Sequence, residues 1–192
     1  MIFHSLDFVV FFLVTVTLYW RLPHRAQNAL LVVASYFFYG YVHPWFLSLV
    51  FVTTVLDYFA GRGMAARPDR KRLFLGLSLA GNLGMLGLFK YFNFFADNIH
   101  AALLVIGLDI PHPALRVILP VGVSFYTFQE LSYTLDVYRG KLAARRNFLA
   151  FAAFVCFFPQ LVAGPIERAS RLLPQIEQPR QFSWSTLARP RS

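Results

Sequence analysis

The sequence predicts an all-α, polytopic transmembrane protein with about six membrane segments, some of them broken or re-entrant. Three observations support this class: an apolar composition, long uncharged runs, and basic residues concentrated between those runs. Of the 192 residues, 57% are apolar or aromatic and 14% are charged, against roughly 25% charged in an ordinary soluble domain. A water-soluble core of this size cannot cover so much apolar surface, so the excess must face lipid.

The same composition excludes a disordered chain, a coiled coil and most soluble enzymes. A net charge of +9 would suggest nucleic-acid binding in a soluble protein. Here the basic residues separate apolar segments, as they do in cytoplasmic loops, so no nucleic-acid partner is expected. The single cysteine, Cys156, belongs to no Cys/His spacing typical of a metal site. Neither a metal nor a bound cofactor is therefore expected.

The first three membrane segments are expected at residues 2–20, 29–41 and 45–60. The first resembles a signal peptide in length, but its basic residues follow the apolar run rather than precede it, so it is interpreted as a retained helix. No Lys, Arg, Asp or Glu occurs from Ala26 to Leu56, a run too long for one span. His43-Pro44 would interrupt a helix and therefore divides the run in two.

The fourth segment is expected at residues 73–95, after a polar loop from Gly61 to Arg72. Three small residues repeat every four positions along this segment: Gly76, Ala80 and Gly84. Such a repeat lets helix backbones approach closely, so this face is predicted to pack against another helix.

The rest of the chain is expected to hold a short apolar stretch and two further segments, at 117–138 and 147–166. The region 97–116 contains the apolar stretch Asn98–Leu108, which is too short to span a bilayer. An interfacial or re-entrant helix is the interpretation for this region. The whole chain, 1–192, is interpreted as a single integral-membrane region.

The distribution of lysine and arginine indicates an orientation. If the N-terminus lies outside and five spans alternate, the inside loops hold eleven basic residues and the outside loops hold two. Cytoplasmic loops carry such an excess. We therefore expect a multi-pass protein whose N-terminus is outside.

The segment 117–138 is unlike a lipid-facing helix. At 100° per residue, one arc holds Val121, Phe125, Phe128, Leu131 and Leu135. A second arc holds Ser124, Thr127, Glu130 and Thr134, and a third holds Tyr126, Gln129, Tyr133 and Asp136. About a third of this helix can therefore face lipid, and the rest must face protein or water.

Glu130 is the most costly residue of that helix. A carboxylate near the middle of the membrane costs several kcal/mol unless it is paired or hydrated. It indicates either a functional cavity or a structural role, through a bond to a neighbouring helix or a neutral carboxyl group; the two interpretations carry equal weight. Asp136 is expected to pair with Arg139, and Asp57 is expected to lie near Arg62 at a helix end.

The segment 147–166 contains helix breakers within an apolar run, at Pro159, Gly164 and Pro165. Irregular backbone at membrane depth is tolerated only where it is buried in protein or lines a cavity. This segment is therefore a second candidate for a cavity wall.

Two motifs resemble the membrane-bound O-acyltransferase family, in its bacterial polysaccharide O-acetylation branch: SFYTFQELSYTLDVYRG (Ser124–Gly140) and FFPQLVAGPIER (Phe157–Arg168). Three stretches support the resemblance: the opening MIFHSLDFVVFF, NALLVVASYFFYG (Asn28–Gly40) and LGMLGLFKYFNFF (Leu83–Phe95). Together they cover nearly the whole chain in order.

The resemblance implies an enzyme of the bacterial inner membrane that transfers an acyl group, expected to be acetyl, for O-acetylation of an exported polysaccharide such as alginate. It implies an acyl donor as substrate, either acetyl-CoA or a carrier-bound acyl group. The implied partners are membrane lipid and periplasmic acetyltransferase proteins. It also implies a substrate tunnel between the spans. The predicted tunnel residues are Ser124, Tyr126, Gln129, Glu130, Tyr133, Asp136, Pro159, Gly164 and Pro165.

The resemblance leaves the catalytic position unfilled. In the family a histidine acts as general base in a later membrane segment, and members are more than twice as long as this chain. We therefore expect an N-terminal fragment of the domain, inactive alone. None of its histidines is expected to be catalytic: His4, His24, His43, His100 and His112.

The alternative is a non-enzymatic scaffold or a transporter-like subunit. Mid-membrane carboxylates and broken helices also occur in transporters. No inverted repeat is visible between the two halves of the chain, which argues against this alternative.

Overall fold

The computed structural model describes residues 6–41, 44–108, 122–163 and 167–180. These residues form α-helices, one 3₁₀ helix and no strand, so the all-α class is confirmed. The elements are α1 (Leu6–Arg21), α2 (His24–Gly40), α3 (Phe46–Ala66), η1 (Pro68–Arg70), α4 (Lys71–Val105), α5 (Val123–Tyr138), α6 (Phe148–Val155), α7 (Phe158–Ala163) and α8 (Ala169–Glu177).

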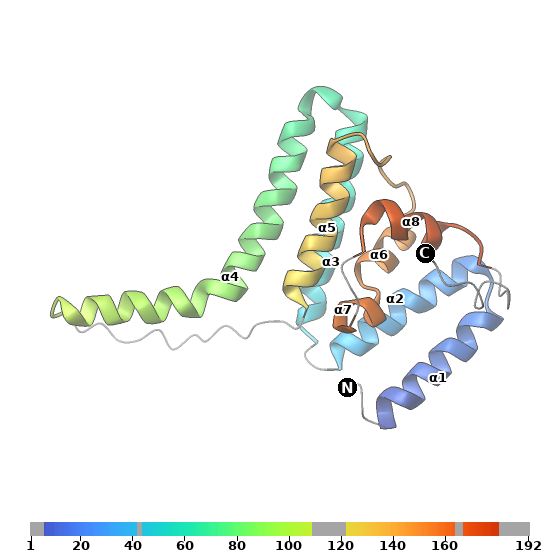
Figure 1. The fold of residues 1–192 in the computed structure, drawn as a ribbon, viewed down its shortest axis with the longest axis horizontal. Coiled ribbons are helices and arrows are strands. Elements are labelled where there is room, and N and C mark those ends of the chain that lie inside the picture. The colour runs from blue at the N-terminus through green and yellow to red at the C-terminus, as the bar shows by residue number, and fades with distance from the viewer. Residues whose placement is uncertain (1–5, 42–43, 109–121, 164–166, 181–192) are drawn as a thin grey trace, which may run out of the picture.

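The helices form two groups that meet at the short helices near the C-terminus (Figure 1). In one group, α3, the first part of α4 and α5 pack side by side. In the other, α1 lies along α2. Helices α6, α7 and α8 fill the space between the groups, where α6 contacts α2, α3, α5 and α8.

Two stretches of the described residues are long and apolar enough to cross a membrane: Phe46–Ala66, and Pro68–Val105, which joins η1 and α4. The other helices have 17 residues or fewer, whereas a membrane-spanning helix needs roughly 20. By length and composition, the structure therefore supports two of the expected six membrane segments.

Several helix boundaries follow the sequence signals. Helix α2 ends at Gly40 and α3 begins at Phe46, on either side of the expected break at His43-Pro44; His43 itself lies outside the described residues. The segment 147–166 is divided into α6 and α7. Asn147 caps the N-terminus of α6, because its side chain accepts a hydrogen bond of 3.2 Å from the backbone N–H of Ala150.

Helix α4 differs from the expectation of a span followed by a separate short helix. It is one helix of 35 residues that bends, and its distal part projects away from α3 and α5 (Figure 1). It ends in a C-terminal cap centred on Gly107, whose φ is +82°. The backbone N–H of Gly107 donates to the oxygen of Leu104, and that of Leu108 to the oxygen of Leu103. No proline precedes this cap within α4, so the helix continues through the region expected to be separate.

The small-residue face of α4 was predicted wrongly. Gly76, Ala80 and Gly84 are exposed, and a Cβ atom added at Gly76 or Gly84 would meet nothing within 4 Å. The buried face of α4 instead carries Ser78, Asn82 and Leu86. The expectation that one face of this helix packs against other helices was therefore right, but the face that meets α3 and α5 is the one that carries Ser78 and Asn82.

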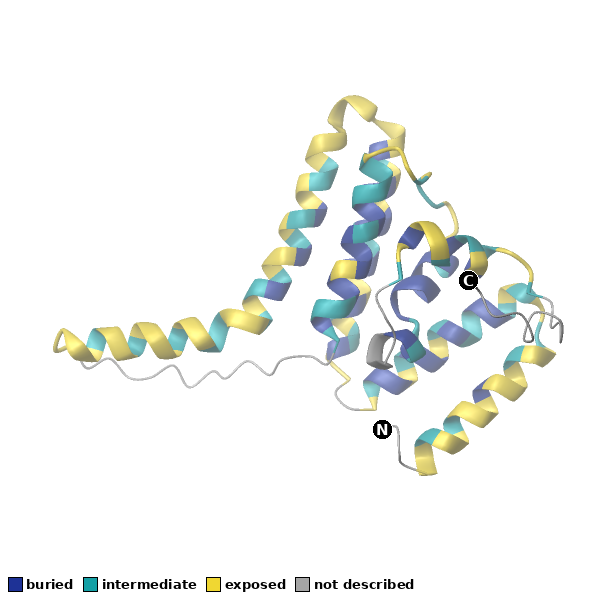
Figure 2. Ribbon diagram, in the orientation of Figure 1, coloured by how far each residue is buried: buried dark blue, intermediate teal, exposed yellow. Residues whose placement is uncertain are grey.

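The most buried part of the fold surrounds α6. All residues from Ala150 to Cys156 are buried, and the ring of Phe151 lies 4.6 Å from that of Tyr133 on α5. By contrast, α1 and the distal part of α4 expose most of their surface (Figure 2). The core thus lies where α5, α6 and α8 meet.

Candidate functional site

Helix α5 turns most of its polar residues inward. It begins after Gly122, whose φ of +79° only glycine adopts without strain. The buried residues include six polar ones: Tyr126, Thr127, Gln129, Glu130, Tyr133 and Thr134. Phe128, on the predicted lipid-facing arc, is 49% exposed, whereas Leu131 on the same arc is buried. The exposed arc is therefore narrower than the sequence pattern suggests.

Glu130 points toward α3. Its side chain is fully buried, and the Thr54 hydroxyl donates a hydrogen bond of 3.2 Å to Glu130 Oε1. The second carboxyl oxygen, Oε2, has no hydrogen-bond partner among the described residues. One of the two interpretations of Glu130, a bond to a neighbouring helix, is thus observed directly, and one oxygen of the group remains able to accept a further bond.

Asp57 does not meet Arg62, contrary to expectation. Asn82 on α4 donates a hydrogen bond of 2.7 Å to Asp57 Oδ2, and both side chains are completely buried. Arg62 instead donates to the hydroxyl of Tyr58 and lies over its ring. The reason is helical geometry: five residues correspond to 500°, which places Asp57 and Arg62 on different faces, whereas Tyr58 and Arg62 are four apart.

These contacts belong to one set of buried polar residues, which we call the polar cluster. It lies between three helices and comprises Thr54, Asp57, Ser78, Asn82, Glu130 and Thr134. Ser78 on α4 donates to Thr134 on α5 at 3.1 Å, so each pair of the three helices shares a side-chain bond. Sequence reasoning missed Ser78 and Asn82; their spacing of four residues on an apolar helix was the available signal.

The polar cluster retains hydrogen-bonding capacity. Three of its buried oxygens lack a donor among the described residues: Asp57 Oδ1, Asn82 Oδ1 and Glu130 Oε2. Buried acceptors of this kind normally bond to water or to a ligand group. No group of three or more His, Cys, Asp or Glu side chains in the described part of the chain could hold a metal ion. The arrangement is therefore suited to hydroxyl or water contacts between helices.

The opposite side of α5 is bonded to α6 and to the loop before it. Gln129 donates 2.7 Å to the backbone oxygen of Phe154. The Tyr133 hydroxyl accepts a 3.0 Å hydrogen bond from the backbone N–H of Arg145. The Tyr126 hydroxyl is buried and has no partner among the described residues.

Ser124 and Asp136, two further predicted tunnel residues, do not belong to the polar cluster, and both are half-buried. The described residues contain no ion pair between Asp136 and Arg139; the backbone oxygen of Asp136 instead accepts bonds from the N–H groups of Lys141 and Leu142. Gly164 and Pro165 lie outside the described residues.

Pro159 lines a cavity of about 400 Å³ between α1, α2, α7 and α8. The walls of this cavity are mainly apolar and aromatic, with Arg180 at its edge. None of the predicted tunnel residues on α5 lines it. The structure thus separates two features that the sequence suggested as one tunnel: the polar cluster within α3–α5 and this cavity.

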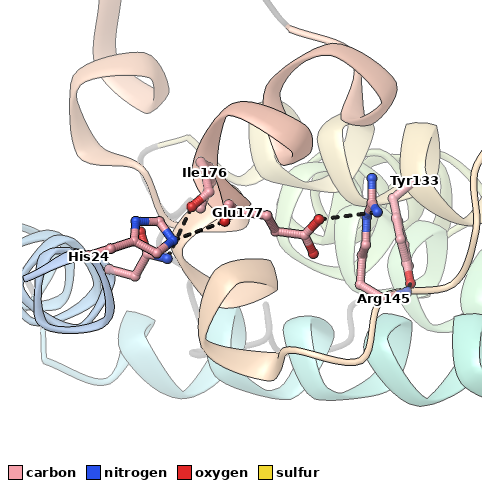
Figure 3. Close-up of polar contacts among 6 residues, drawn as sticks. His24, Tyr133, Arg145, Ile176 and Glu177 are labelled. Atoms are coloured by element: carbon pink, nitrogen blue, oxygen red, sulfur yellow. Dashed lines mark hydrogen bonds and ion pairs between the residues drawn. The ribbon is translucent and has the colours of Figure 1, made fainter. Parts of the chain in front are cut away.

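Helix α8 is held in place by polar contacts from distant parts of the chain (Figure 3). His24 Nε2 lies 3.0 Å from the backbone oxygen of Glu177, and Arg145 forms an ion pair of 3.1 Å with the Glu177 carboxylate. Asn28 donates 3.1 Å to the backbone oxygen of Ile176. His24 therefore anchors α8.

The fold and the site together define a class: a helical protein with apolar outer surfaces and polar groups buried between its helices. Comparison with known proteins makes the class specific. The chain is 42% identical over 181 residues to a probable alginate O-acetylase of Pseudomonas syringae pv. tomato, an alignment that covers 91% of this chain and 34% of the relative. It is 40% identical over 181 residues to the corresponding Pseudomonas aeruginosa protein, with the same coverage.

A third relative carries a different name. The chain is 33% identical over 190 residues to a peptidoglycan O-acetyltransferase of Helicobacter pylori, covering 83% of this chain and 35% of that protein. No family model and no solved structure matches. The chain spans about a third of the length of these curated relatives. Its resemblance to O-acetyltransferases of the membrane-bound O-acyltransferase type is confirmed.

Proposed function

We propose that this chain is part of a membrane-bound O-acyltransferase that transfers acetyl groups for O-acetylation of an exported polysaccharide such as alginate. One observation carries the proposal: identity of about 40% over 91% of the chain with proteins named alginate O-acetylases. The acyl donor, acetyl-CoA or a carrier-bound acyl group, is a substrate and not a resident cofactor.

The part played by this chain follows from its polar cluster. Transfer of an acetyl group to a hydroxyl requires a general base that removes the hydroxyl proton. Of the histidines that the structure describes, His24 and His100 lie outside the polar cluster. The proposal assigns the base to another part of the enzyme, and the 192 residues alone are expected to be inactive. Helix α5, with Glu130 and the neighbouring tunnel residues, forms one wall of the acyl-transfer path.

The proposed topology is multi-pass in the bacterial inner membrane, with about six segments and the N-terminus outside. It is supported by contacts that bring separate basic stretches to one end of the fold. Lys71 Nζ lies 5.0 Å from the Tyr138 ring centroid, which places the start of α4 beside the end of α5. Arg145 in turn contacts Glu177 near the start of α2. A single basic end matches the excess of positive charge in cytoplasmic regions.

The distal part of α4 lies at the opposite end of the bundle from these basic stretches (Figure 1). Its large apolar side chains are exposed: Phe94 is 60%, Phe95 58% and Ile99 58% accessible. Lys90 lies over the ring of Tyr91. Exposed aromatic residues with an adjacent cation are typical of a helix in the membrane interface. We assign this part of α4 to the periplasmic surface of the inner membrane, where periplasmic acetyltransferase partners would also act.

A chimaera tests the proposed function. The segment of the Pseudomonas aeruginosa relative that aligns with this chain is replaced by the chain itself, and the acetyl content of secreted alginate is measured by proton NMR in cells lacking the native protein. We expect acetylation to be retained. A chimaera present at normal levels in the membrane but giving no acetylation would contradict the proposal and favour the scaffold alternative.

The same chimaera tests Glu130. Glu130→Gln is expected to lower acetylation at least about tenfold, which corresponds to about 1.4 kcal/mol of lost transition-state stabilisation. Glu167→Gln is the matched control, because Glu167 is half-buried and, among the residues that the structure describes, its carboxylate makes a long contact of 3.9 Å to Arg171. Unchanged acetylation at equal protein levels would leave Glu130 with a purely structural role.

A further inference from the structure

The cavity between α1, α2, α7 and α8 is a groove with one charged end. Its apolar wall includes Phe12, Val16, Leu31 and Phe158. The hydroxyl of Thr15, which also lines it, is already bonded to the backbone oxygen of Phe11. At about 400 Å³ the groove is within the size range of small-molecule sites. The lining is mainly apolar, and Arg180 is the one charged residue among the described residues that line it.

Arg180 brings a positive charge that nothing in the described part of the chain neutralises. Its Nη2 donates to the side chain of Asn28 at 3.1 Å and to the backbone oxygen of Ile176 at 3.3 Å. Its Nη1 is buried and has no partner there. The guanidinium lies 5.4 Å from the centroid of the Tyr19 ring, which fixes it beside the last turn of α1. No carboxylate among the described residues forms an ion pair with it.

The groove has the dimensions and position of an acyl-chain site. Helix α1 contributes lining residues from Phe12 to Trp20, a rise of about 12 Å, close to half of the roughly 30 Å hydrocarbon core. Both residues are more than 40% exposed, so the groove is open to the surroundings of α1. A chain can therefore enter sideways from lipid.

We propose that this groove binds an anionic phospholipid, with one acyl chain along α1 and the headgroup phosphate on Arg180. The charge complementarity is specific to the end of the groove: a net negative headgroup meets the unpaired guanidinium, and the apolar wall below it accepts the chain. Because Arg180 Nη2 already donates to two acceptors, the N–H groups of Nη1 are the ones left to donate a charge-assisted hydrogen bond to a phosphate oxygen. The proposal does not depend on acetyl transfer.

Trp20 in the groove provides the readout. In a Trp45→Phe/Trp184→Phe background, the full chain is placed in phosphatidylcholine nanodiscs containing a small fraction of brominated phosphatidylglycerol or brominated phosphatidylcholine. Bromine on the acyl chain quenches tryptophan fluorescence on contact. From the quenching of Trp20, we expect brominated phosphatidylglycerol to associate about fivefold more strongly than brominated phosphatidylcholine. Unlabelled phosphatidylglycerol should compete with the brominated anionic lipid and reverse the quenching. Equal quenching by the two lipids would overturn the proposal.

Charge variants test the headgroup contact. Arg180→Gln should abolish the anionic preference, and Arg180→Lys should keep most of it. Arg171→Gln removes the same charge from an exposed position on α8 that does not line the groove, and should leave the preference unchanged. If Arg180→Gln keeps the preference, or if Arg171→Gln loses as much, general surface charge is responsible and the proposal is wrong.

A second pair of variants tests the acyl groove independently, in case Arg180→Gln perturbs α8. Val16→Phe fills the groove, whereas Val14→Phe adds the same bulk on an exposed part of α1 that does not line it. We expect quenching by brominated phosphatidylglycerol to fall several-fold in Val16→Phe alone. Equal quenching in both variants would contradict occupancy of the groove.

Discussion

Asn82→Ala tests whether the buried bond between α3 and α4 holds these helices together. Asn82 Nδ2 lies 2.7 Å from Asp57 Oδ2, and both side chains are 0% exposed. The other Asp57 oxygen has no partner among the described residues. Truncation of Asn82 therefore leaves a buried carboxyl group without the donor observed here, which carries the cost of an unsatisfied buried acceptor.

Two magnitudes bound the effect. A hydrogen bond to a charged group contributes about 1.5–3 kcal/mol, whereas polar contacts between helices in a membrane average about 0.6 kcal/mol with a maximum near 1.7. The short distance and full burial favour the upper part of the membrane range. We expect the coupling energy between Asp57 and Asn82 to be about 1.5 kcal/mol.

The assay is a double-mutant cycle with Asp57→Ala, Asn82→Ala and the double variant. The free energy of unfolding is measured by titrating detergent-solubilised protein with sodium dodecyl sulfate and following helicity. Asn98→Ala is the matched control. Like Asn82, Asn98 donates to the backbone oxygen four residues earlier, but it is exposed on the distal part of α4. Asn98→Ala should change the free energy of unfolding by no more than about 0.5 kcal/mol. A coupling energy below about 0.3 kcal/mol would refute the assignment of this bond as a stabilising contact.

Two further predictions concern packing and charge. Gly61→Ala should destabilise the fold by about 1–2 kcal/mol, because the added Cβ would lie 2.6 Å from the hydroxyl of buried Tyr133. In Gly76→Ala the added Cβ meets nothing within 4 Å, so this variant should be neutral or stabilising by about 0.5–1 kcal/mol. Thermal melts of the two variants in detergent distinguish these results. Arg145→Gln breaks the half-buried ion pair with Glu177 and should lower the free energy of unfolding by about 1 kcal/mol at low salt. At 1 M salt the decrease should be smaller, because salt screens the ion pair. A decrease that does not depend on salt would show that the charge of Arg145 is unimportant.

The sequence alone determined much of the architecture. The breakers at His43-Pro44 and in 147–166 predicted that the helices are interrupted there, because proline disrupts a helix locally. The expected ends of α3 and α4, at residues 60 and 95, fell short of the observed ends at Ala66 and Val105. The 100° period predicted that most of α5 is buried. Two motifs with three supporting stretches indicated the acyltransferase resemblance, which the curated relatives confirm.

The sequence could not assign partners to buried polar side chains. Asp57 has Arg62 nearby in sequence but bonds to Asn82, which lies 25 residues away on α4. Gly76 and Ala80 read as a packing face but are exposed. Local periodicity shows which residues share a face, but it carries no information about the helix that the face meets.

The tertiary structure decided which faces meet and where space remains. Packing of α3, α4 and α5 brought the polar cluster together, and docking of α8 through Glu177 and Ile176 placed Arg180 at the edge of the groove. These juxtapositions join residues up to 153 positions apart in the chain. They depend on the summed packing of whole helices rather than on any local signal, which is why the sequence determined the class and the helices, and the structure alone decided the contacts.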